Sequence, residues 1–72
     1  METNVRLKLG RRIKQLRKKH ELTQDKLSEI SEIDYKYVQR IEGKNPPALK
    51  IDTLQRLAKA FNITISRLLN FK

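Results

Sequence analysis

The residues best suited to binding chemistry lie between positions 35 and 40, on one face of a predicted helix. Lys and Arg side chains can donate to O6 and N7 of guanine, and a Gln amide can pair with N6 and N7 of adenine. A Tyr ring can lie against a thymine methyl group or a sugar. The alternative interpretation is a polar helix face that only contacts solvent. The helices predicted around this face distinguish between the two interpretations. The four residues of this face are Tyr35, Lys36, Gln39 and Arg40.

Residues 22–44 encode two short helices joined by a tight turn. Thr23 and Asp34 are N-cap candidates, and each is flanked by the two apolar residues of a hydrophobic staple. We therefore expect helices over about 24–30 and 35–42, separated by only about three residues. Two capped helices this close together are typical of a helix-turn-helix, here spanning about residues 23–42. The apolar residues expected to face one shared core are Leu27, Ile30, Val38 and Ile41.

Three further helices are predicted from apolar spacing, and no strand is expected. The first helix has a buried stripe formed by Val5, Leu9, Ile13 and Leu16. Residues 43–49 must form a loop because Pro46 and Pro47 cannot donate within a helix. Asn62 is a candidate left-handed residue at a helix end, and Thr64 can cap a short last helix. The apolar residues of the last two helices are Ile51, Leu54, Leu57, Ala58, Phe61, Ile65, Leu68 and Leu69.

The composition restricts the class of protein. The chain has 72 residues, a net charge of +9 and no cysteine. A domain of this length hides only about 60 % of its unfolded surface, so we do not expect a buried catalytic cleft or an enzyme. The charge indicates a polyanionic partner, with nucleic acid ahead of an anionic membrane or an acidic protein. The absence of cysteine excludes disulfides and thiolate metal sites, and it fits a reducing cytoplasm.

Membrane insertion, export and metal binding are not expected. No apolar run approaches the roughly 20 residues needed to cross a bilayer, and residues 1–10 lack the apolar core of a signal peptide. His20 is expected at the surface or at a helix end, since no second His and no Cys accompany it. We therefore expect a cytoplasmic protein, associated with the nucleoid, that needs no metal and no cofactor.

Three segments of the sequence resemble the XRE-type regulators, the family of the lambdoid phage repressors and Cro proteins. LTQDKLSEISEIDYKYVQRIEGK resembles the family's helix-turn-helix, and LGRRIKQLRKKHE and DTLQRLAKAFNITISRLL resemble its first, fourth and fifth helices. The resemblance covers about residues 5–70 and implies an all-α, compact five-helix lambda-repressor-like domain over residues 1–72. As a small chain it is also similar to the controller proteins of restriction-modification systems and to Cro-like repressors.

Two positions depart from the family pattern. Glu32 occupies the turn position that is usually Gly, and family members usually have one more residue between Glu42 and Gly43. If Glu32 adopts the left-handed conformation that Gly adopts easily, a strain of roughly 1 kcal/mol follows.

The resemblance also implies roles for individual residues. Tyr35, Lys36 and Arg40 match positions that contact base edges, and Gln39 shares their face. Arg17 and Glu42 match a structural ion pair that holds the recognition helix against the first helix. Surface solvation is the alternative for the residues that match phosphate-contacting positions. Those residues are Gln24, Tyr37, Lys44, Asn45 and Lys50. The residues of the first helix expected to add only long-range attraction are Arg11, Arg12, Lys18 and Lys19.

These observations predict a sequence-specific, double-stranded DNA-binding transcriptional regulator from a bacterium, a phage or a mobile element. We expect a homodimer that binds an inverted-repeat operator, with its seam at the last helix, where Ile65, Leu69 and Phe71 are expected to be exposed. One alternative is an antitoxin that binds both its operator and a toxin. Another is a general nucleic-acid or ribosome-associated binder. RNA polymerase remains a further candidate partner, and the chain is either a stand-alone regulator or the DNA-binding part of a longer one.

Overall fold

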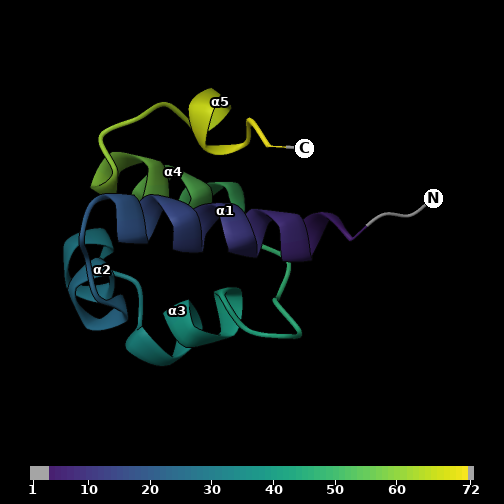
Figure 1. Ribbon diagram of the computed structural model, residues 1–72, viewed down its shortest axis with the longest axis horizontal. Helices are drawn as coiled ribbons and strands as arrows, with labels where there is room; N and C mark the ends of the chain where they lie inside the picture. The colour runs from purple at the N-terminus through teal and green to yellow at the C-terminus, as the bar shows by residue number, and fades with distance from the viewer. Residues whose placement is uncertain (1–3, 72) are drawn as a thin grey trace.

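The computed structural model describes residues 4–71, and every regular element in this range is an α-helix (Figure 1). In Figure 1 the long first helix crosses the middle of the view, with α2 and α3 below it and α4 and α5 above it. The predicted all-α fold with five helices is therefore confirmed. The helices are α1 (Val5–Lys19), α2 (Gln24–Ser31), α3 (Tyr35–Ile41), α4 (Ile51–Ala60) and α5 (Ile65–Leu68).

The core draws on all five helices and follows most of the predicted stripes. Three predictions of burial were wrong: Val5 is 58 % exposed, Ile30 is 45 % exposed and Ile51, the first residue of α4, is 68 % exposed. The buried part of α1 begins only at Leu9. In α2, Leu27 and Ser31 are buried one helical turn apart, which leaves Ile30 beside the buried line. The buried apolar residues are Leu9, Ile13, Leu16, Leu27, Ile33, Val38, Ile41, Leu57, Ala58, Phe61 and Leu68.

The predicted N-caps all form hydrogen bonds. The Thr23 hydroxyl accepts from the backbone N–H of Lys26 at 3.0 Å, and the Asp34 carboxylate accepts from the N–H of Lys36 at 3.1 Å. The Thr64 hydroxyl caps α5 in the same way, at 3.1 Å from the N–H of Arg67. Because each cap satisfies an amide that the helix cannot pair internally, these residues determine where α2, α3 and α5 begin.

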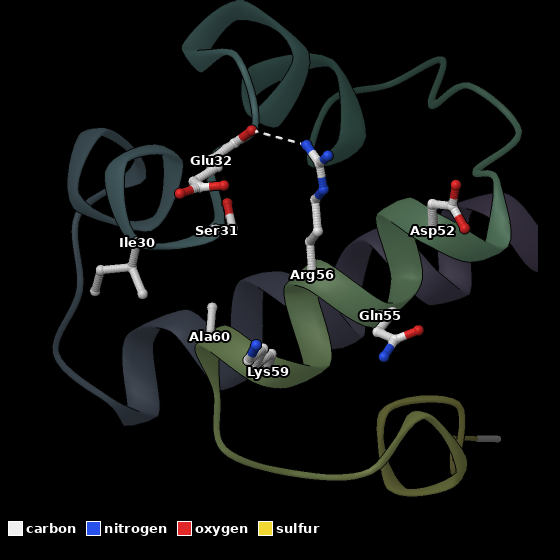
Figure 2. A pocket seen from close by; sticks show the side chains of 8 residues that line it. All are labelled: Ile30, Ser31, Glu32, Asp52, Gln55, Arg56, Lys59 and Ala60. Carbon is white, nitrogen blue, oxygen red and sulfur yellow. Dashed lines mark hydrogen bonds between the residues drawn. The ribbon is translucent and has the colours of Figure 1, made fainter.

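The turn between α2 and α3 has the left-handed conformation anticipated at Glu32, with φ of 60°. From α4, the Arg56 guanidinium donates to the Glu32 carbonyl at 3.2 Å (Figure 2). The Ser28 hydroxyl donates to the Ile33 carbonyl at 2.5 Å. Asn62 is left-handed as predicted, whereas the left-handed conformation of Glu21 was not predicted. The turn is thus held from two helices, which offsets the strain of a residue other than Gly at this position.

Gly10 allows α1 to pass very close to the carboxyl end of α3. A Cβ atom at this position would overlap the backbone carbonyl oxygen of Ile41. Gly within a helix is unfavourable by about 1 kcal/mol relative to Ala. The close approach explains why the helix contains Gly here, and it determines how deeply α3 packs against α1.

Around α5, the structure changes two of the sequence-based expectations. Ile65 and Phe71 are half-buried against the core, so only Leu69, at 41 %, counts among the exposed large hydrophobic residues in this segment. Arg12 was expected to contribute only long-range attraction. Its guanidinium instead donates to the carbonyls of Arg67 at 2.8 Å and Leu68 at 3.3 Å, which satisfies the carboxyl end of α5. Within residues 4–71, no helix has the length and apolar character to cross a membrane.

Candidate nucleic-acid interface

The short helix α3 separates a buried face from an exposed polar face. Val38 and Ile41 are 0 % and 1 % exposed and anchor the helix in the core. The opposite face is open to solvent, and it carries side chains that donate hydrogen bonds. Within this face the Gln39 amide donates to the Tyr35 hydroxyl one turn away, at a long 3.4 Å. The structure therefore brings together on one surface the four residues that were predicted to read bases: Tyr35, Lys36, Gln39 and Arg40.

Tyr37 and Arg40 form a pair on the edge of this face. The sequence suggested a phosphate contact for Tyr37, and the structure places its ring half-buried against the core. The Arg40 guanidinium carbon lies 5.9 Å from the centre of that ring. A cation above an aromatic ring at an exposed site is stabilised by about 0.5–1 kcal/mol. The ring thus restricts the positions of the Arg40 side chain. This contact was not predicted, although residues three apart on a helix are neighbours.

The structure also joins Arg17 of α1 to Glu42, the residue that ends α3. The Arg17 Nε donates to Glu42 Oε2 at 2.8 Å and its Nη2 donates to Oε1 at 3.0 Å, a bidentate geometry. The third guanidinium nitrogen, Nη1, donates to the Leu22 carbonyl at 2.7 Å. The two side chains are only 11 % and 2 % exposed. The guanidinium therefore holds the carboxyl end of α3 and the segment before α2 in fixed positions relative to α1.

Gln24 adds α2 to this network. Its amide Nε2 donates to Glu42 Oε1 at 3.0 Å, so the carboxylate accepts three hydrogen bonds from two side chains. Because a carboxylate only accepts, the NH₂ end of the amide must face Glu42. The second amide N–H of Gln24 is then held at the start of α2, where unpaired backbone N–H groups favour an anion. Sequence reasoning assigned Gln24 to a phosphate but missed this contact with Glu42.

The remaining residues predicted to contact phosphate lie beyond the carboxyl end of α3. Lys44 and Asn45 are exposed in the loop that leaves this end of the helix (Figure 1). Lys50 is exposed at the N-cap position of α4, next to backbone N–H groups that the helix does not pair. The predicted phosphate contacts therefore fall into two groups, one at the start of α2 and one after α3, with the polar face of α3 between them in the chain.

A cleft of about 540 Å³ lies between the end of α2 and α4 (Figure 2). It is lined by side chains of both charges, with Glu32 and Asp52 near Arg56 and Lys59. This mixture does not favour an anion or a cation. Among residues 4–71, His, Cys, Asp and Glu side chains form no group of three or more that could hold a metal ion.

Comparisons with known proteins agree with this geometry. Residues 13–68 match the model of a helix-turn-helix family. The fold is similar to the crystal structure of the restriction-modification controller protein C.AhdI from Aeromonas hydrophila, with a TM-score of 0.81 and 28 % sequence identity. This similarity covers 88 % of the chain and 94 % of C.AhdI. A search of curated protein sequences found no match. From the family match, the structural similarity and the exposed polar face of α3, the chain belongs to the XRE-type helix-turn-helix family of DNA-binding transcription regulators.

Proposed function

We propose that the chain regulates transcription as a homodimer bound to an inverted-repeat operator in double-stranded DNA. The observation that carries this proposal is the exposed polar face of α3 on a helix whose other face is fully buried. In a dimer, two such helices would enter successive major grooves about 34 Å apart. Occupancy of the operator would then block or recruit RNA polymerase. Similarity to a restriction-modification controller protein supports a regulatory role for this DNA binding.

Lys36 and Arg40 are the principal base-reading residues of the proposal. Both are exposed cations on α3, and both can donate to O6 and N7 of guanine. The contact of Arg40 with the Tyr37 ring supports this role, because a restricted side chain loses less entropy on binding. Tyr35 and Gln39 would contact neighbouring bases or the sugar-phosphate backbone.

Phosphate contacts would set the register of α3 in the groove. Gln24 would act at the start of α2, supported by the fixed orientation of its amide. Lys44, Asn45 and Lys50 would act after α3. The Arg17 guanidinium would lie near the same strand as Gln24, held by Glu42 so that its charge faces the backbone without free rotation.

The dimer seam of the proposal lies at α5. Leu69 is 41 % exposed there, and the half-buried Ile65 and Phe71 flank it. One module of this size makes too few contacts for selective binding, so two copies would be needed to read an operator. Sedimentation of the purified chain should give the mass of a dimer. Replacing Leu69 by Lys should shift that mass toward the monomer without lowering helix content.

The decisive experiment is selection of random duplexes by the purified protein. We expect recovery of an inverted repeat whose half-sites are centred about 10–10.5 base pairs apart, one turn of DNA. Recovery of a single, unrepeated site would contradict the dimer. Equal binding to random duplexes and to RNA would contradict sequence-specific regulation and favour a general nucleic-acid binder.

A further inference from the structure

A second cleft lies beside the polar face of α3, between the start of α1 and the loop that follows α3. Its volume is about 330 Å³. From α1 it is lined by Arg6, with Asn4 just before the helix, and from α3 by Arg40. Lys44 and Asn45 complete its polar lining from the loop. The cleft thus places a residue of the base-reading face next to α1. Of the residues of α1, Arg17 alone has so far been assigned a position near a phosphate.

The lining of this cleft favours an anion. The described residues around it contribute three cationic side chains and two amides, and no carboxylate. The two clefts that border the α2–α3 turn are lined by carboxylates as well as by cations. A cleft between α1 and the segment around α5 also has cations and no carboxylate, but no residue of α3 lines it, and the Arg12 guanidinium in its lining is already bonded to the Arg67 and Leu68 carbonyls. Anions are attracted to a concave surface that carries a single sign of charge, because its low-dielectric walls concentrate the field. The start of α1 adds to this field, because the N-terminus of a helix carries a partial positive charge. No acidic residue within the first turn of α1 reduces that charge.

We propose that this cleft binds a backbone phosphate of duplex DNA and that Arg6 is a DNA-contacting residue of α1. The inference rests on the proposed function, because it places the phosphate on DNA that α3 already reads. Continuity with the interface supports DNA over a free anion: Arg40 lines the cleft from α3, and Lys44 and Asn45 line it from the loop with predicted phosphate contacts. Arg6 would then add a strand contact beside Arg40 and the loop that follows α3.

The test compares Arg6→Gln with Arg11→Gln on the duplex that the wild-type protein selects. Arg11 is an exposed Arg on the same helix and lines none of the clefts described, so both variants lose one positive charge. Each phosphate neutralised contributes about 0.9 to the log-log salt slope. For each protomer bound, Arg6→Gln should therefore reduce the slope by about 0.9 and weaken binding roughly fivefold at 0.15 M salt. Arg11→Gln, which removes only long-range attraction, should change the slope by clearly less.

Ethylation interference identifies the phosphate directly. With wild-type protein, ethylation of one particular phosphate in each half-site should interfere with binding. This interference should disappear with Arg6→Gln and persist with Arg11→Gln. Unchanged thermal melting of both variants shows that the fold is intact. Titration of the free protein with inorganic phosphate, monitored by amide chemical shifts, tests whether the cleft binds free phosphate and not a phosphate of DNA. Saturable binding of free phosphate at this cleft, with no loss of DNA affinity in Arg6→Gln, would overturn the DNA contact.

The two proposals fail in different ways. If the wild-type protein shows no selective, salt-dependent binding to any duplex, the proposed function is wrong. If the wild-type protein binds selectively but Arg6→Gln and Arg11→Gln give the same slope and the same interference pattern, only the role of Arg6 is wrong.

Discussion

Removal of the Glu42 carboxylate should destabilise the fold far more than removal of a surface charge. The Glu42 side chain is 2 % exposed and accepts hydrogen bonds from Arg17 and Gln24. Without it, the Arg17 guanidinium stays nearly buried with only the Leu22 carbonyl as a described partner. Breaking a buried pair on one side costs about 3 kcal/mol or more. A chain of this length has roughly 4–11 kcal/mol of stability in total, so Glu42→Leu should remove a large part of it.

The assay is a double-mutant cycle measured by urea unfolding, followed by circular dichroism. The single variants Arg17→Met and Glu42→Leu should each lose about 3 kcal/mol, because each leaves an uncompensated polar group. The double variant should lose no more than one single variant, which gives a coupling energy of about 3 kcal/mol or more. DNA affinity should stay low in the double variant, since the positive charge assigned to a position near the phosphate is gone.

The chain offers a matched control for this cycle. Lys26 and Glu29 form an ion pair at 3.3 Å on the surface of α2, with side chains 57 % and 73 % exposed. Lys26→Met combined with Glu29→Leu should give a coupling energy of at most about 0.5 kcal/mol. If the Arg17 and Glu42 variants are additive to within about the same value and DNA binding is unchanged, the reasoning about the buried network is refuted.

Three further predictions concern DNA binding and packing. Affinity of the dimer for its operator should fall with salt at a log-log slope of about −4 to −7; a flat profile in a filter-binding titration would contradict phosphate contacts. Lys36→Ala and Arg40→Ala should each lose roughly 1–3 kcal/mol on the selected site and little on random DNA, whereas Lys50→Ala should weaken both alike. Equal behaviour of these variants would exclude α3 as the reader. Gly10→Ala should lower stability by roughly 2–3 kcal/mol because the added methyl meets the α3 backbone. Gly43→Ala, whose Cβ would lie 3.2 Å from the nearest carbonyl oxygen, should cost clearly less in the same unfolding assay.

Local signals in the sequence were sufficient to predict where most helices begin. Thr23, Asp34 and Thr64 each cap an amide within the next three residues, so the relevant information lies in adjacent positions. Burial depends on the neighbours that the fold supplies. For this reason Val5 and Ile30 matched an apolar stripe and were nevertheless exposed.

Contacts between distant segments were accessible only in part. The pairing of Arg17 with Glu42, 25 residues apart, was anticipated through family resemblance and not through any local pattern. The bonds from Arg12 and Arg56 end on backbone carbonyls 24 or more residues away, and a carbonyl is present at every position of every sequence. No residue type therefore marks such an acceptor. Gly10 carried a signal that was not used in the sequence-based predictions, since Gly inside a helix often has a packing reason.

The separation of faces on α3 has a consequence for how this protein can change its target. The residues that hold the helix in place, Val38 and Ile41, are different from those proposed to contact DNA. Exchanges at exposed positions such as Lys36 and Gln39 usually alter stability by no more than about 0.5 kcal/mol. A new operator preference can therefore arise through a few surface substitutions, without compensating changes in the core. Related chains with the same fold should then diverge in the sequences that they bind faster than in the residues that fold them.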